Sequence, residues 1–360
     1  EILSSSANYN FVLRAVEGDV QNFYTAYNAF LQLSPADTAF WNLADQYFDM
    51  IYYNDYLISE IWMNNADWCF NYNNLKIYRS DATDNRWRYC LMDLEYGLLP
   101  NPSNDFSCAF DLLGGLIGWQ SQDPNNPHFT IFWRGIQNDR FRSYFINRFA
   151  DLMNSLYLPS RLVAIENSMY NQTIAEMANE YERWGDPNNV PGQLNSFFQN
   201  HILFQNELLC RPENARNYIQ SNFNLPQQVE VKLDVYPFNT GKINISTITP
   251  DSYPWNGIYF DGVPIKIEAI ALPGYQFSHW ESNGLITDSL NPVFLDTLSL
   301  SVVDFTAHYT IATGVVEQTP STLLIYPNPA HDRITIKPCG NSGEIERITI
   351  MDIIGKHYEI

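Results

Sequence analysis

The sequence has 360 residues, more than one compact domain of usual size, so two to four domains are expected. Forty acidic residues against twenty lysines and arginines give a net charge of −20, which disfavours nucleic acid and anionic membranes as partners because both would be repelled. No stretch approaches the roughly 20 apolar residues of a membrane-spanning helix, so no transmembrane segment is expected.

The first 225 residues are predicted to be mainly helical. Apolar side chains recur there at spacings of three and four residues, which is the period of an α-helix. Two of the helices open near a proline, Pro159 and Pro191, a residue that the first turn of a helix tolerates. We expect helices over 36–64, 138–157, 159–183, 191–210 and 212–222.

A β-hairpin is expected within this helical part. Residues 73–79 and 87–92 are short β-prone runs, and turn-forming Ser, Asp and Asn residues separate them. The order along this stretch is therefore a helix, a loop rich in asparagine and then a hairpin.

The pattern changes at Leu225-Pro226. The following residues alternate polar and apolar side chains, broken by proline and glycine turns, which predicts a small all-β module. A short linker over 312–321 precedes a second β segment that begins at Leu323. The predicted fold is multidomain and α+β, a mainly helical lobe followed by two small all-β modules. The expected domains are 1–225, 226–311 and 312–360.

The five cysteines form no dense disulfide framework and contain no CxxC pair, so a structural zinc site is disfavoured. Their odd number leaves at least one free thiol. In an exported protein Cys69 with Cys90 is the first pair to examine, because both flank the candidate site described next. Buried free thiols explain these residues equally well. The six histidines show no metal-ligand spacing, which disfavours a zinc enzyme.

Two stretches contain the residues for a candidate active site. In the first, Asp67 is followed by several asparagines; in the second, a returning strand leads to Asp93 and Glu95. Phosphoryl transfer uses such a set, because one carboxylate orients the attacking hydroxyl while an amide oxygen and a second carboxylate hold magnesium on the phosphates. An aspartate near an asparagine is more often a helix cap or a turn former. The prediction therefore rests on the order of the segments.

These two stretches resemble the signature of the CotH (spore-coat protein H) kinase family, atypical secreted kinases related to the protein-kinase fold. The matching residues are Asn-Ala-Asp-Trp at 65–68, the asparagine pair at 73–74, Trp87-Arg88 and Asp93-Leu94-Glu95 with a following glycine. The resemblance implies Asp67 as the catalytic acid and Asp93 and Glu95 as metal-binding acids. The asparagine pair lies further from the aspartate than in the family, so the amide that binds metal or nucleotide stays open among Asn71, Asn73 and Asn74.

The resemblance implies ATP and Mg²⁺ as cofactors, with Mn²⁺ as an alternative ion. It continues downstream through 132–154, Glu182–Gly185 and Arg211-Pro212, residues expected to build the core and rim of the helical lobe. The family's N-terminal lobe supplies nucleotide-gripping glycines or a lysine, and the sequence contains no GxGxxG or GxxxxGK segment. We therefore expect an N-terminally truncated kinase-like lobe that folds but is inactive alone.

The two β modules have resemblances of their own. Pro273-Gly274-Tyr275-x-Phe-x-x-Trp280 resembles the internalin-type B-repeat module, in which we expect Tyr275 and Trp280 to lie in the core. Residues 326–329, Tyr-Pro-Asn-Pro, and the closing Gly355-Lys356 resemble the C-terminal sorting domain of type IX secretion substrates, here cut short at its end. This implies the type IX machinery as a partner, and secretion or display on the outer membrane of a Bacteroidetes-like bacterium.

Two functions of different classes remain open from the sequence. The first is an exported ATP- and magnesium-dependent kinase that modifies serine or threonine of an unidentified protein. The second is a non-catalytic cell-surface binding or scaffold protein with a kinase-like lobe. A glycosidase pair drawn from Asp67, Asp93 and Glu95 ranks lower, because it accounts for the many Trp and Tyr residues but not for the asparagine cluster.

Overall fold

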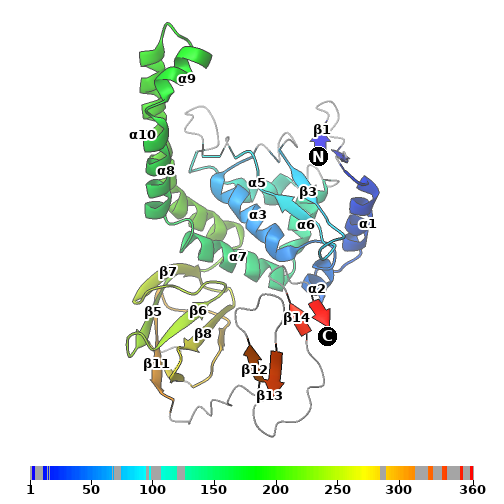
Figure 1. The fold of residues 1–360 in the computed structure, drawn as a ribbon, viewed down its shortest axis with the longest axis vertical. Coiled ribbons are helices and arrows are strands. Elements are labelled where there is room, and N and C mark those ends of the chain that lie inside the picture. The colour runs from blue at the N-terminus through cyan, green and yellow to red at the C-terminus, as the bar shows by residue number, and fades with distance from the viewer. Residues whose placement is uncertain are drawn as a thin grey trace. The chain divides into compact units, whose positions relative to one another are not determined.

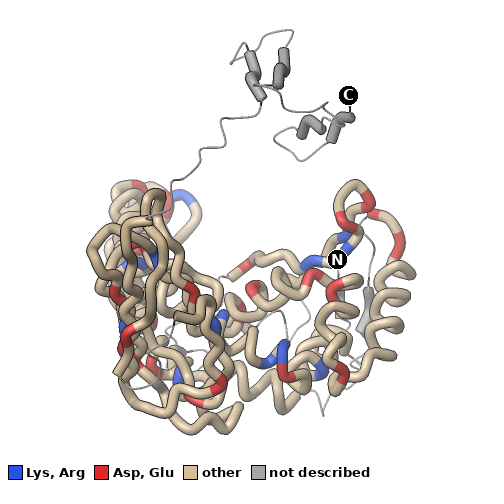
Figure 2. The backbone as a smooth tube through the Cα atoms, turned by 90° about the horizontal axis from the view of Figure 1, so that it is seen from below, with Lys and Arg blue, Asp and Glu red and all other residues tan. Residues whose placement is uncertain are grey.

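The computed structural model contains helices and several small sheets, so the fold is mixed α+β (Figure 1). The chain divides into two compact units, one of residues 1–273 and 277–309 and one of residues 274–276 and 310–360. Acidic positions are spread along most of the described backbone (Figure 2). The structure describes residues 2–4, 11–13, 15, 17–66, 68, 74–94, 97–98, 107–119, 126–283, 289–312, 323–326, 335–338, 349–351 and 357–359.

The first helices enclose a core rich in aromatic side chains. The predicted helix over 36–64 is interrupted, because α2 ends at Ala44 and α3 begins only at Met50. Two aspartates cause the break: Asp49 Oδ1 accepts a hydrogen bond from Tyr52 N as the N-cap of α3, and Asp45 Oδ1 accepts from Met50 N. The elements up to residue 135 are β1 (Ile2–Ser4), β2 (Phe11–Leu13), α1 (Val20–Leu31), α2 (Phe40–Ala44), α3 (Met50–Met63), β3 (Lys76–Tyr78), β4 (Arg88–Cys90), α5 (Leu112–Trp119) and α6 (Pro127–Gly135).

Four helices follow, and the predicted boundaries are partly correct. The prediction over 138–157 is confirmed, with Asn138 as the N-cap. The range 159–183, predicted as one helix, contains two helices. The predicted break between residues 210 and 212 is wrong, because one helix runs through Pro212. Pro212 has no N–H to donate within the helix, but the buried Arg211 beside it fixes this turn to other parts of the fold. The four helices are α7 (Asp139–Met153), α8 (Pro159–Thr173), α9 (Met177–Trp184) and α10 (Val190–Asn222).

The predicted change to β structure after residue 225 is confirmed, and the strands form two sheets. One has the order β7-β5-β11-β9, with β11 parallel to β5, and the other has the order β10-β8-β6. Trp280 is 1% exposed and lies in the core as expected, but Tyr275 is 37% exposed because it opens the edge strand β9. The strands are β5 (Gln228–Tyr236), β6 (Gly241–Ile245), β7 (Trp255–Phe260), β8 (Ile265–Ala271), β9 (Tyr275–Ser282), β10 (Val293–Leu295) and β11 (Val302–Ile311).

Helix α7 joins the helical part to these sheets through buried polar contacts. The Asp151 carboxylate accepts hydrogen bonds from Thr247 N at 2.9 Å and from the Tyr259 hydroxyl at 2.6 Å. The Asn154 side chain both accepts from Ile258 N and donates to Ile258 O. These contacts lie within one compact unit. The division into separate domains at 225–226 stays a prediction.

The second unit contains two antiparallel strand pairs, β12 (Leu323–Tyr326) with β13 (Thr335–Pro338) and β14 (Thr349–Met351) with β15 (His357–Glu359). Nearly all of the predicted linker, and the residues 327–329 and 355–356 of the sorting-domain motifs, lie outside the described residues. Among the helices that the structure describes, none has both the length and the apolar composition to cross a membrane.

Candidate functional site

Two of the predicted site residues lie at the same end of one hairpin. Strands β3 and β4 pair antiparallel with Lys76 opposite Cys90, so the residues before β3 and after β4 are neighbours. Asn74 precedes β3 and Asp93 follows β4. Both have left-handed backbones, with φ of 56° and 55°, a conformation that asparagine and aspartate adopt more readily than other non-glycine residues. The Asp93 side chain is exposed.

Asp67, Asn71, Asn73 and Glu95 lie outside the described residues. Their neighbours are described: Trp68 is 1% exposed and its ring packs edge-on against that of Tyr56.

The end of α3, which leads to Asp67, contacts the segment that holds Asp93. The Asn65 side-chain amide donates to Glu60 Oε2 at 2.8 Å and lies 3.4 Å from the backbone oxygen of Asp93. A methyl group added at Gly97 would lie 2.9 Å from the Met63 backbone oxygen, so this close approach of two backbones requires glycine. The two stretches singled out in the sequence therefore meet in the fold.

Glu60 is a buried acid that bonds to Asn65, the residue in contact with the Asp93 backbone. Its side chain is fully buried, and burial raises the pKa of its carboxyl to about 8, although hydrogen bonds with Asn65 and Tyr56 act to lower it. The carboxyl group is therefore mostly protonated at neutral pH. Glu60 was not among the predicted site residues, and Asn65 was part of the matched motif at 65–68 without a predicted role. The available signal was an acidic residue between the apolar residues Leu57, Ile58 and Ile61 at the end of a helix.

Asp93 and two asparagines at the end of α3 carry oxygen atoms of the kind that a hard cation such as Mg²⁺ binds. Asp93 offers an exposed carboxylate, and Asn64 Oδ1 and Asn65 Oδ1 are buried and accept no hydrogen bond from any described residue. Carboxylate and amide oxygens are the donors that Mg²⁺ prefers, and it keeps several water ligands as well. The described residues thus fit the chemistry of a magnesium ion.

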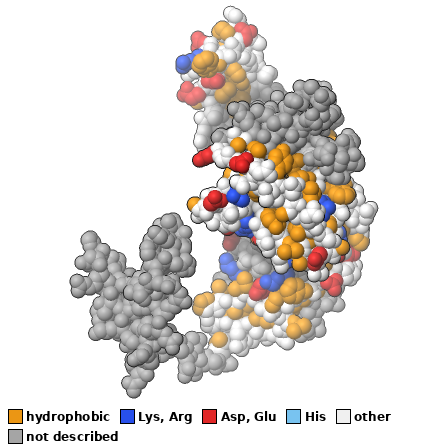
Figure 3. All heavy atoms as spheres, turned by 90° about the vertical axis from the view of Figure 1, so that its right-hand side faces the viewer, with side chains coloured by type: hydrophobic (Ala, Val, Ile, Leu, Met, Phe, Trp, Pro, Cys, Tyr) orange, Lys and Arg blue, Asp and Glu red, His pale blue; other side chains and the backbone are white. Residues whose placement is uncertain are grey.

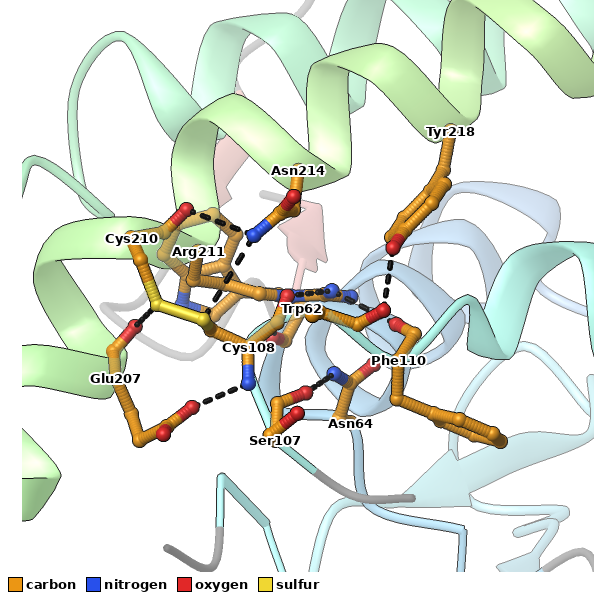
Figure 4. The surroundings of a disulfide bond; sticks show 11 residues. Trp62, Asn64, Ser107, Cys108, Phe110, Glu207, Cys210, Arg211, Asn214 and Tyr218 are labelled. Atoms are coloured by element: carbon orange, nitrogen blue, oxygen red, sulfur yellow. Dashed lines mark hydrogen bonds between the residues drawn. A yellow bond between two sulfur atoms is a disulfide. The ribbon is translucent and has the colours of Figure 1, made fainter.

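Arg211 of α10 holds the end of α3 in place (Figure 4). Its guanidinium group is 1% exposed and donates to the backbone oxygens of Ile61 at 2.6 Å and Trp62 at 2.9 Å, and to those of Cys108 and Phe110 at 3.0 Å each. A cation at a helix C-terminus satisfies carbonyls that lack a partner within the helix. Burial lowers the pKa of Arg211 to about 10, so it stays charged at neutral pH.

A disulfide joins Cys108 to Cys210 next to this arginine. Of the two alternatives for Cys90, a pair with Cys69 or a free thiol, the structure has the free thiol, and burial raises its pKa. Packing of α10 on the segment at 107–110 brings the Cα atoms of Cys108 and Cys210 to 6.0 Å, a usual distance for a disulfide. The cluster of these two sulfurs and the Glu207 carboxylate could hold a metal ion by its geometry alone. In the structure the sulfurs are bonded to each other instead.

Arg88, of the Trp87-Arg88 pair in the hairpin, connects the hairpin to the start of α3. Arg88 lies between two carboxylates, with Nε 3.0 Å from Asp49 Oδ2 and Nη1 2.8 Å from Asp84 Oδ1. Arg88 also holds the pKa of Asp84 well below its usual range. Since Asp49 is the N-cap of α3, these ion pairs tie the hairpin to the start of α3.

The architecture and these residues define a mixed α+β protein with a mainly helical lobe, in which the end of α3 meets the segment that holds Asp93. A comparison with protein families gives a match to the CotH kinase protein family over residues 9–209, more than half of the chain. The chain therefore belongs to the CotH kinase family. Comparisons with curated proteins and with solved structures give no match.

Proposed function

We propose that this chain is the helical lobe of an atypical protein kinase that transfers the γ-phosphate of ATP to serine or threonine of a partner protein. The observation that carries the proposal is the family match, because residues 9–209 include all six predicted site residues. The contact between the end of α3 and Asp93 supports it, since residues 28 positions apart in sequence meet there.

In this proposal Asp67 orients the acceptor hydroxyl, and Asp93, Glu95 and one of Asn71, Asn73 or Asn74 hold the metal ion. Magnesium, or manganese in its place, neutralises the phosphate charges when bound. The remaining work is positioning by the chain itself. Asn65 holds the backbone at Asp93, and Arg211 fixes the end of the helix that leads to Asp67.

The test is transfer of labelled γ-phosphate from ATP with Mg²⁺, to the full-length gene product itself and to a generic basic protein. We expect label with the natural sequence, and a loss of roughly 100-fold or more in Asp93→Ala, because the metal-binding carboxylate is gone. Asp81→Ala is the matched control, since Asp81 is an exposed acid in the turn of the same hairpin. Absence of label with a folded natural protein would overturn the proposal and favour the non-catalytic scaffold.

We also propose that the protein is exported. The Cys108–Cys210 disulfide supports this, because disulfides form and persist in oxidising compartments. Residues 226–311 would form a B-repeat-like module and residues 312–360 a type IX sorting domain, on the sequence motifs given above. Deleting 312–360 should then leave the protein inside the outer membrane, as cell fractionation would detect. Unchanged export of the deleted form would contradict the sorting role.

A further inference from the structure

Helices α8 and α10 leave a groove of about 470 Å³ open between them. Its walls are the stretch of α8 from Leu162 to Thr173 and the stretch of α10 from Phe197 to Leu208, with Met63 of α3 at one end. Most of the lining is apolar: Leu162, Ile165, Met169, Phe197, Phe204 and Leu208. A pocket of this volume is large enough for a ligand or for several side chains of a partner.

The spacing of the lining residues is that of a surface for another helix. On each helix they recur every three or four residues, the pattern of one helical face. The stretch of α8 covers about 16 Å, or three turns. α8 contains no buried residue, and Ile165 and Met169 are 46% and 63% exposed. Exposed apolar side chains gathered along one face mark an interaction site.

Glu166 and His201, two polar side chains of the groove, are paired across it. The Glu166 carboxylate lies 2.6 Å from His201 Nδ1 and accepts a hydrogen bond from Gln205 Nε2, also at 2.6 Å. The His201 ring stacks on that of Tyr170 with centroids 3.9 Å apart. These contacts cross from α8 to α10, so they fix the distance between the two walls.

The helices that form the groove carry more acidic than basic residues, and of these acids Glu166 lines the groove itself. Helices α8, α9 and the first part of α10, residues 159–207, form an arm that projects away from α3 and α7 (Figure 1), and its free end shows hydrophobic and charged side chains together (Figure 3). A second copy of this chain would bring like charges together, whereas a basic partner would be attracted. The arm has only two arginines, Arg161 and Arg183, against six acids: Glu166, Glu176, Glu180, Glu182, Asp186 and Glu207.

We propose that the groove binds an amphipathic α-helix of a partner protein, with an apolar face of about three turns and lysine or arginine on its flanks. The inference does not depend on kinase activity. The partner helix would complete a three-helix packing with α8 and α10 and cover the exposed side chains of Ile165 and Met169.

The test uses two fluorescein-labelled synthetic helices of about five turns. Both have leucines at helical spacing on one face; the remaining positions are lysine in one peptide and glutamate in the other. Fluorescence anisotropy with the full chain should show binding of the lysine peptide, and binding of the glutamate peptide weaker by roughly tenfold or more. The double substitution Ile165→Glu and Met169→Glu should weaken binding of the lysine peptide by roughly tenfold or more, since it charges the apolar wall.

Both positions are exposed, so the variant is expected to fold, which circular dichroism checks. Phe294→Glu in β10, 72% exposed, is the matched control and should bind like the natural protein. Hydrogen exchange should show protection by the lysine peptide within 162–173 and 197–208. Three results would overturn the inference: equal affinity for the two peptides, lysine-peptide binding that the double substitution leaves intact, or no binding. If the natural protein sediments as a dimer and the double variant as a monomer, the groove binds a second copy of the chain instead.

Discussion

Helices α7 and α8 follow one another in the chain and have the same length of 15 residues, yet their surroundings differ completely. Nine residues of α7 are buried, and none of α8. α7 lies between the aromatic core and the sheets, and Asp151 and Asn154 bond to strand residues from it. α8 packs along α10, and its residues Leu162, Ile165 and Met169 line the open groove.

The comparison shows that a helical pattern in the sequence does not reveal how much a helix contributes to stability. A helix was expected over 138–157 from the spacing of its apolar residues and another over 159–183 from the proline that opens it. The first range forms α7, and the second forms α8 and α9. Most of the stability of a helix in a protein comes from tertiary packing of its apolar face and little from intrinsic propensity. α7 should therefore be essential to the fold, whereas the exposed apolar face of α8 is accessible to a partner helix.

The largest change in the free energy of unfolding is expected from the ionisation of Glu60, which lies in α3, a helix that packs against α7. Below pH 4.5, its ordinary pKa, the carboxyl is protonated in both the folded and the unfolded chain. As the pH rises toward about 8 only the unfolded chain ionises, so the free energy of unfolding falls. Relative to Glu60→Gln, the natural protein should lose roughly 4–5 kcal/mol between these two pH values. Denaturant titrations at several pH values measure this difference. Parallel pH curves for the two proteins would show that Glu60 is ionised in the fold.

Phe149→Ala, in α7, should come next. Phe149 is 0% exposed and packs in the aromatic core, so the substitution leaves a cavity and should lower the free energy of unfolding by about 3–5 kcal/mol. The shift of the denaturation midpoint measures it. A loss below about 1 kcal/mol would contradict the central place given to α7.

Loss of the disulfide should have an intermediate effect, because it anchors the base of the arm to the core. Cys108 and Cys210 are 102 residues apart in sequence, and opening a loop of that size should reduce stability by about 2–4 kcal/mol. The substitution Cys108→Ser with Cys210→Ser tests it by thermal unfolding. Cys90→Ser, at the free thiol, is the control and should change little. Equal effects of the two changes would argue against the bond.

The smallest effect is expected for Met169→Ala in α8. The side chain is 63% exposed, so its truncation should change the free energy of unfolding by less than about 0.5 kcal/mol. The difference between the losses of unfolding free energy in Phe149→Ala and Met169→Ala measures how much more α7 contributes to stability than α8. A loss above about 2 kcal/mol would mean that the face of α8 is already covered in solution.

Much of the fold could be predicted because its patterns are local. The spacing of Phe141, Phe145 and Phe149 predicted α7, and the turn-rich residues after Arg79 predicted the hairpin. The failures came from contacts distant in sequence. A break between two helices was expected at residue 211, and nothing near it in sequence showed that Arg211 would be fixed to the end of α3. The same distance hid the pairing of Cys108 with Cys210.

For the candidate site, the sequence supplied Asp93 and Asn74, and the hairpin register brings them to one end. It did not supply Glu60, because whether an acid within an apolar run is buried and protonated depends on what packs around it. The roles of Asp67, Asn71, Asn73 and Glu95 stay predictions.

The bonds of Arg211 also set an order of events during synthesis. The carbonyls of Ile61 and Trp62 receive their donor from a residue about 150 positions later in the chain. These two hydrogen bonds can therefore form only after a ribosome has completed most of the helical lobe. Contacts so distant in sequence are formed late and slow the folding of a chain. Until residue 211 emerges, the carbonyls of Ile61 and Trp62 lack this donor, so a chain that stops before α10 should hold the end of α3 less firmly.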